Sequence, residues 1–160
     1  MKNKKFLAIF AVAILVFTYS CKKEDPKPSN TFDFTITANG QALKDGDTIT
    51  YNTVENGLIN PQIRITKTSN SSVSTTLKVT NDANSTNTIV QICGWQGAAG
   101  QCQVIMAGES LSFTQTISDN TPQDPQIEIN PLSAFSFSAK VTISLTANGI
   151  TKTFYWDCKN

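Results

Sequence analysis

The sequence predicts an all-β fold, an antiparallel sandwich of about eight or nine strands that follows a signal peptide and a flexible tether. Apolar and polar residues alternate in several short runs, among them Phe32 to Ile36, Val73 to Val79 and Val141 to Leu145. This period of two is that of a half-buried strand. Stretches rich in Asn, Asp, Gly and Ser separate the runs, at the spacing expected for a sandwich.

The last two strands can be paired residue by residue. Asn148-Gly149, between two alternating runs, predicts a two-residue hairpin turn. One face of the resulting hairpin is apolar, so we expect Trp156 in the core. The expected pairs on that face are Ala147 with Ile150, Leu145 with Lys152, Ile143 with Phe154, Val141 with Trp156 and Ala139 with Cys158.

A second pattern bears on the number of sheets. Ile63 and Ile65 share one parity, whereas Leu77 and Val79 share the other. A simple hairpin that turns at residues 69–72 would put the two sets on opposite faces. Either the loop holds an odd number of residues, or the chain crosses to the other sheet, as in a Greek key.

The first twenty residues have the features of a secretory signal. Three lysines among the first five residues precede an apolar run from Phe6 to Phe17, and Ser20 ends the segment. A basic head, a short apolar stretch and a small residue are typical of a signal peptide. The apolar run is much shorter than the roughly 20 residues that a transmembrane helix needs. We therefore expect residues 1–20 to direct export.

Cys21 follows this segment directly. The region resembles a bacterial lipoprotein signal, in which the cysteine after the cleavage point receives lipid and becomes the first residue of the mature protein. Ser20 fits the small residue of such signals, whereas Thr18 and Tyr19 depart from the usual leucine and small residue. The resemblance implies that Cys21 is lipidated and that the membrane is a partner. A plain secretion signal with a free Cys21 is the alternative.

The resemblance also bears on location. We expect residues 21–31 to be the lipidated cysteine and a disordered tether, and residues 32–160 to be the β-sandwich domain. Pro26 and Pro28 favour extended backbone, and their polar neighbours offer nothing to bury. The segment from Lys22 to Asp25 is similar to the charged tag of surface-exposed lipoproteins of the Bacteroidota. This implies an outer-membrane protein that is exposed at the cell surface.

Charge and composition exclude several classes of function. Without the three lysines of the signal, ten basic residues stand against twelve acidic ones, a net charge of −2, and they form no basic stripe. The chain thus lacks the cluster of basic residues that proteins use to bind the phosphates of nucleic acids. Histidine is absent, which excludes serine–histidine–aspartate and cysteine–histidine catalysis and histidine-ligated metals. We expect no cofactor and no metal.

Three cysteines remain after Cys21. Cys93 and Cys102 bracket an eight-residue loop rich in glycine and alanine, and in an exported chain a disulfide is the leading interpretation. A zinc site would need four ligands, and a redox site usually has two residues between its cysteines. Cys158, on the inner face of the hairpin, is expected to be a buried thiol. A bridge from Cys158 to one of the other two is the alternative.

The loop between Cys93 and Cys102 holds the candidate ligand contacts Trp95, Gln96 and Gln101. The indole could offer a flat face to a sugar ring or a protein partner, with the two glutamines as hydrogen-bonding groups. In the favoured alternative the indole folds back and covers the end of the sandwich, because scattered aromatic residues are common at protein surfaces.

Acidic residues occur mainly in turns. Asp45-Gly46-Asp47 resembles a fragment of a calcium loop without the remaining ligands, and a tight turn is favoured. Asp119, Asp124, Glu128 or Asp45 could supply the carboxylate pair of a glycosidase if two of them converge about 5–9 Å apart. The prolines beside them favour an ordinary loop, so no catalytic residue is assigned.

Taken in order, these features resemble immunoglobulin-like sandwich domains of surface lipoproteins of the Bacteroidota. The resemblance is carried by the signal, the acidic tag, the proline tether, "NGQALKDGDTI" and the closing "ANGITKTFYW" hairpin. It implies a non-enzymatic, lipid-anchored cell-envelope module that binds a glycan or protein ligand. The alternatives are a small glycan hydrolase with paired carboxylates, and a structural subunit of an envelope assembly with an exposed sheet edge or apolar patch.

Overall fold

The structure, a computed structural model, describes residues 31–52, 54–55, 57–95, 101–133 and 136–159. These residues form strands and turns and no α-helix, so the all-β prediction is confirmed. Within these ranges there are eleven strands, more than the eight or nine expected, because several short ones accompany the long ones. The strands are β1 (Phe34–Ala38), β2 (Gln41–Ala42), β3 (Thr48–Tyr51), β4 (Ile63–Lys67), β5 (Val73–Asn81), β6 (Thr88–Cys93), β7 (Cys102–Ile105), β8 (Ser110–Ile117), β9 (Gln126–Pro131), β10 (Ser138–Ala147) and β11 (Ile150–Lys159).

The first layer is a five-stranded sheet in the order β3-β11-β10-β5-β8. Its β10–β11 hairpin has the register expected from the sequence, from Ala147 opposite Ile150 to Ala139 opposite Cys158. Asn148 and Gly149 form the turn with positive φ angles of 52° and 77°, as a type I′ hairpin requires. Turn chemistry and alternation therefore sufficed to predict this register.

One pairing in the first layer differs from the expected antiparallel pattern, because β3 runs parallel to β11. The turn before β3 explains the difference. The N–H of Gly46 donates to the carbonyl of Thr153 (2.8 Å), and the N–H of Thr153 donates to the carboxylate of Asp45 (2.7 Å). The turn is thus fastened to the side of β11 before β3 begins. Asp45-Gly46-Asp47 is a turn, as favoured.

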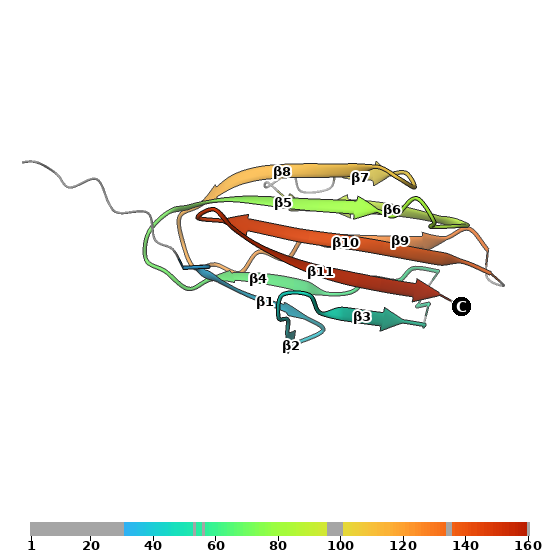
Figure 1. Ribbon diagram of the computed structural model, residues 1–160, viewed down its shortest axis with the longest axis horizontal. Helices are drawn as coiled ribbons and strands as arrows, with labels where there is room; N and C mark the ends of the chain where they lie inside the picture. The colour runs from blue at the N-terminus through green and yellow to red at the C-terminus, as the bar shows by residue number, and fades with distance from the viewer. Residues whose placement is uncertain (1–30, 53, 56, 96–100, 134–135, 160) are drawn as a thin grey trace, which may run out of the picture.

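The second layer consists of two three-stranded sheets, β2-β1-β4 and β7-β6-β9. They meet along a line, here called the seam, where residues 59–65 lie antiparallel to residues 123–129. Backbone N–H groups and carbonyls are exchanged between Ile59 and Ile129 (both 2.9 Å) and between Ile65 and Gln123 (2.8 and 2.9 Å). Strands of both layers run along the long axis of the molecule (Figure 1).

The chain crosses from the second layer to the first between β4 and β5. The alternation in these two strands allowed either this crossing or a hairpin with an odd number of loop residues. Lys67, the last residue of β4, lies on the inner face and is 3% exposed. Its ammonium group donates hydrogen bonds to the carbonyls of Ser69 (2.7 Å) and Ser71 (2.9 Å). The buried ammonium group of Lys67 thereby stabilises the loop that connects the two layers.

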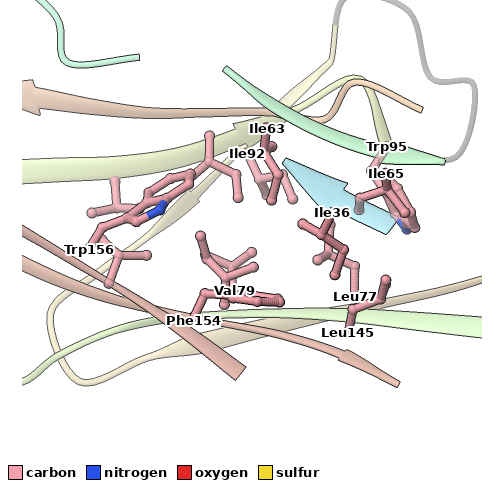
Figure 2. Packing of buried hydrophobic residues seen from close by; sticks show 14 of the residues in the cluster. Ile36, Ile63, Ile65, Leu77, Val79, Ile92, Trp95, Leu145, Phe154 and Trp156 are labelled. Carbon is pink, nitrogen blue, oxygen red and sulfur yellow. The ribbon is translucent and has the colours of Figure 1, made fainter. Parts of the chain in front are cut away.

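Side chains from the two layers meet in one apolar core (Figure 2), so the sandwich prediction is confirmed. Trp156 and Phe154 of β11 are among its largest fully buried side chains, and Trp156 is in the core as expected. Cys158 is a free, fully buried thiol. Both layers contribute apolar residues from every second position of their long strands, as the alternation predicted.

Candidate functional site

The seam is formed by two segments of similar sequence, NPQIRI (60–65) and DPQIEI (124–129). Gln62 pairs with Gln126 at its centre. Because the segments are antiparallel, they are related by an approximate twofold axis that passes through this glutamine pair. The remaining opposite pairs with outward side chains in this register are Asn60 with Glu128 and Arg64 with Asp124.

Two prolines weaken the pairing in the middle of the seam. In an antiparallel pair, every second pair of residues exchanges backbone hydrogen bonds, and Pro61 and Pro125 occupy these positions between the two bonded ends. Proline has no N–H to donate. Each of these two positions can therefore form at most one backbone hydrogen bond, whereas the positions at both ends of the seam exchange two. The pairing is therefore weaker at the centre of the seam than at its ends.

A pocket of about 400 Å³, here called the seam pocket, lies at the centre of the seam. The side chains of Gln62 and Arg64 are exposed whereas Ile63 and Ile65 are buried, so the pocket is on the outer face of the second layer. Its volume is within the range of small-molecule sites. The pocket is lined by Thr37, Gly40, Asn60, Gln62, Ile63, Arg64, Asp124, Pro125 and Gln126.

The charged side chains of the seam pocket neutralise each other. Arg64 Nε and Nη2 each donate a 2.8 Å hydrogen bond to one carboxylate oxygen of Asp124, although the two side chains are 58% and 50% exposed. These hydrogen bonds and the attraction of the guanidinium lower the pKa of Asp124 and raise the pKa of Arg64. The pair is ionised at neutral pH and adds no net charge to the pocket.

Three amide side chains line the seam pocket, those of Asn60, Gln62 and Gln126. For the described residues, no hydrogen bond is found to the side chains of Asn60, Gln62 or Gln126. Outside the pocket lining, the amide of Gln91 donates to Glu128 (2.5 Å) and that of Asn39 donates to Tyr51 (3.4 Å). The pocket thus gathers amides that can each donate and accept.

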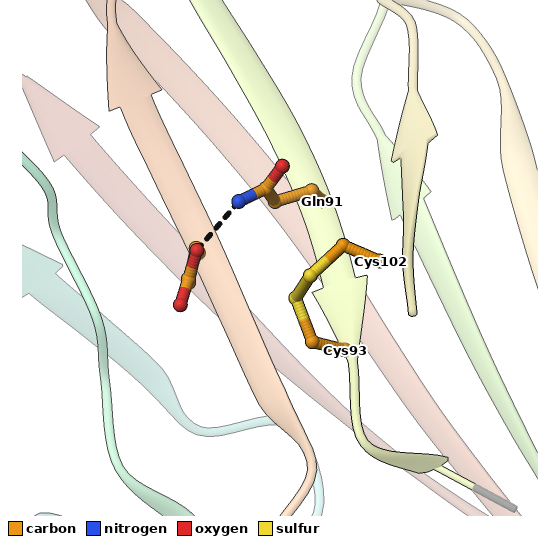
Figure 3. Close-up of a disulfide and its surroundings, with 4 residues drawn as sticks. Gln91, Cys93 and Cys102 are labelled. Carbon is orange, nitrogen blue, oxygen red and sulfur yellow. Dashed lines mark hydrogen bonds between the residues drawn. A yellow bond between two sulfur atoms is a disulfide. The ribbon is translucent and has the colours of Figure 1, made fainter. Parts of the chain in front are cut away.

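The disulfide predicted between Cys93 and Cys102 is present. It joins directly opposite residues of β6 and β7, and Gln91 lies two residues earlier on β6 (Figure 3). Cys93 is also opposite Gln126 on β9, a residue of the seam pocket. The disulfide therefore fixes the outer face of the sheet next to the pocket.

The candidate contacts in the loop between these cysteines have different outcomes. Gln96 lies outside the described residues, and Gln101 is exposed. Trp95 is 5% exposed and belongs to the core. This corrects the expectation of a displayed ring, because burying so large an apolar side chain is favourable. The folded-back arrangement that was favoured describes Trp95.

The four carboxylates considered for glycan hydrolysis are held separately. Asp45 accepts from Thr153, Asp119 from the N–H of Thr121 (3.0 Å), Asp124 from Arg64 and Glu128 from Gln91. The two nearest in sequence are four positions apart on one extended segment, about 13 Å at 3.3 Å per residue. This geometry gives no support to a carboxylate pair.

No group of three or more acidic, cysteine or histidine side chains suited to a metal ion is found among the residues that the structure describes. The same part of the chain contains no helix that could cross a lipid bilayer.

The sequence analysis weighed Asp124 only as a catalytic acid and missed the pocket around it. The signal was the repeated Pro-Gln-Ile at 61–63 and 125–127. Proline is unusual inside paired strands, so two strand-like segments with proline at the same position indicate an interrupted pairing.

No protein-family model and no curated protein sequence matches the chain. Among solved structures, the N-terminal domain of PorA is similar, with a TM-score of 0.51 and 17% identity over 79% of this chain and 96% of that one. A family 123 glycoside hydrolase from Clostridium perfringens has a TM-score of 0.39 and 17% identity, over 71% of this chain and 22% of that one. The first likeness shows a shared fold, and the second carries no argument.

Proposed function

We propose that the chain is an exported, lipid-anchored cell-envelope protein whose β-sandwich binds a ligand without transforming it chemically. The observation that carries this proposal is the seam pocket, where exposed amides with no hydrogen-bond partner among the described residues lie beside an ion pair. Such a lining recognises by hydrogen bonding. It contains one carboxylate, which a guanidinium already holds, and so lacks the second carboxylate of a glycosidase.

Contacts at the start of the folded domain support the proposal that a tether precedes it. The amide of Asn148, in the β10–β11 turn, donates to the carbonyl of Thr31 (3.2 Å) and to the carboxylate of Asp33 (2.9 Å). The ammonium of Lys152 lies 4.4 Å from the centre of the Phe32 ring. The chain is thus fastened to one end of the sandwich where the tether joins it, while the C-terminal end of β11 is at the other end (Figure 1).

The membrane anchor rests on Cys21, and the outer-membrane, surface-exposed location rests on the charged tag that follows it. Growing the source cells with radiolabelled fatty acid tests the anchor. We expect the parent chain to carry the label and Cys21→Ala to lack it. Cys158→Ala is the matched control, because that thiol is buried in the folded domain, and it should keep the label. An unlabelled parent chain would overturn the lipid anchor.

Surface exposure has a separate test. Protease added to intact cells should degrade the anchored chain, whereas a periplasmic control protein should survive. Protection of the chain until the cells are lysed would move it to the inner side of the outer membrane.

A further inference from the structure

Three properties of the seam pocket restrict its ligand. The first is charge. In the part of the chain that the structure describes, the charged side chains that line it are Arg64 and Asp124, which pair with each other. Nearby Glu128 accepts a hydrogen bond from Gln91. The pocket therefore offers no net charge to attract an anionic or a cationic ligand, and an uncharged ligand needs none.

The second property is the kind of hydrogen-bonding group. Three primary amides and the hydroxyl of Thr37 line the pocket, and each can both donate and accept. A sugar hydroxyl also does both, so it can use either end of an amide.

The third property is position in the sheet. The seam pocket lies between β4 and β9, inside the second layer, and each of these strands has a further neighbour on its other side, β1 and β6. A peptide that binds by strand addition needs a free sheet edge, which this position does not offer. The ligand therefore has to be recognised through side chains.

We propose that the seam pocket binds a short uncharged oligosaccharide segment, with Gln62 and Gln126 as the central pair of contacts. This inference rests on the proposed binding function and gives it a ligand class. The approximate twofold relation of the two glutamines places like amides side by side at the centre of the pocket. Two such groups can hold neighbouring hydroxyls of one sugar unit.

The test is an array of neutral and anionic oligosaccharides of matched length, probed with the full chain in detergent. We expect the chain to bind neutral members, and the double variant Gln62→Ala/Gln126→Ala to weaken this binding by about tenfold or more, since it loses both central hydrogen-bonding groups. The matched control is Gln103→Ala, an exposed amide on β7, which should bind like the parent. Equal melting temperatures for all three proteins would show that folding is unchanged.

Three results would overturn the inference. They are binding of anionic members alone, neutral binding that the double variant retains, and no binding to any member of the array. In the last case the binding function itself would survive if the chain still captured a protein ligand from the cell envelope. Conversely, release of sugar products from a bound oligosaccharide would overturn the non-enzymatic function, while the effect of the double variant would still support the pocket as the site.

Discussion

Arg64 on β4 and Asp124 just before β9 stand opposite each other across the seam and are joined by two hydrogen bonds of 2.8 Å. On one side of this pair, Ile65 and Gln123 exchange two backbone hydrogen bonds, and on the other side Pro125 has no N–H to donate to Ile63. A side-chain pair thus adds to the backbone link between the two sheets of the second layer, next to a position that a proline weakens. This arrangement has consequences for stability that can be measured.

Neutralising Asp124 should remove a small, acid-sensitive part of the stability. The pKa of Asp124 is lowered, chiefly by the hydrogen bonds from Arg64. A carboxyl of this kind stabilises the fold above its unfolded pKa, near 4, and the stabilisation is lost as pH falls through the folded pKa. In urea denaturation, Asp124→Asn should therefore be less stable than the parent at pH 7, and this difference should shrink as the pH falls below about 4.

The effect is expected to be small because both side chains are half exposed or more. Arg64→Gln should lose the same part of the stability, and adding Asp124→Asn to it should cost nothing further. A double variant whose losses simply add would contradict the coupling.

Removing the disulfide should destabilise the domain by about 2–3 kcal/mol, because Cys93–Cys102 closes a short loop in the unfolded chain. The measurement is the urea midpoint of Cys93→Ala/Cys102→Ala against the parent. A reducing agent should bring the parent to the level of the double variant. Cys158→Ala should keep its sensitivity to the reducing agent, since that thiol takes no part in the bridge.

The thiol of Cys158 should be unreactive in the folded protein. Burial, and to a smaller extent the charge of Asp157, raises its pKa to about 12, so almost no thiolate exists at pH 8. Alkylation followed by mass spectrometry should leave Cys158 unmodified in native buffer and modify it in concentrated urea. Rapid labelling of the native protein would show that the β11 end opens readily.

Gly149→Ala should destabilise the β10–β11 hairpin by about 1–2 kcal/mol, because its φ of 77° is strained for a residue with a Cβ. No atom lies within 4 Å of the position that the new Cβ would occupy, so the cost is one of backbone conformation alone. Gly149→Asn is the control and should lose less, since asparagine tolerates this region. Equal losses for the two variants would point to a steric cause instead.

Replacing the buried lysine of β4 should loosen the crossing between layers. Lys67→Met keeps the apolar stem and removes the donor to Ser69 and Ser71, and we expect a loss of about 1–3 kcal/mol. Amide hydrogen exchange should rise first in residues 68–72. An exchange pattern like that of the parent would mean that water replaces the ammonium group at no cost.

Local patterns predicted the parts of this fold that depend on neighbours in sequence. The β10–β11 register followed from one Asn-Gly turn and the alternation beside it, and the turn at Asp45-Gly46-Asp47 followed from its composition. The parallel pairing of β3 did not, because it depends on the hydrogen bonds of Gly46 and Asp45 with Thr153, more than a hundred residues away. Burial of Trp95 was likewise a tertiary outcome.

The seam pocket depends on a contact between segments about sixty positions apart. Each segment alone is a strand interrupted by proline, and nothing local says that Pro61 and Pro125 weaken the same ladder. The repeated Pro-Gln-Ile could have suggested the pairing, but the facing of Arg64 and Asp124 needs the register that packing of the isoleucines imposes.

The hydrogen bonds from Asn148 in the β10–β11 turn to Thr31 and Asp33 affect how the domain resists a pulling force. A pull on the chain ahead of Thr31 enters β1 along its length, so its five pairs with β4 are sheared at once rather than unzipped in turn. If the protein is stretched between a lipid anchor and a bound oligosaccharide, the force acts along the strands, which is the direction in which they resist separation most. Single-molecule pulling from residue 31 should therefore measure a high unfolding force.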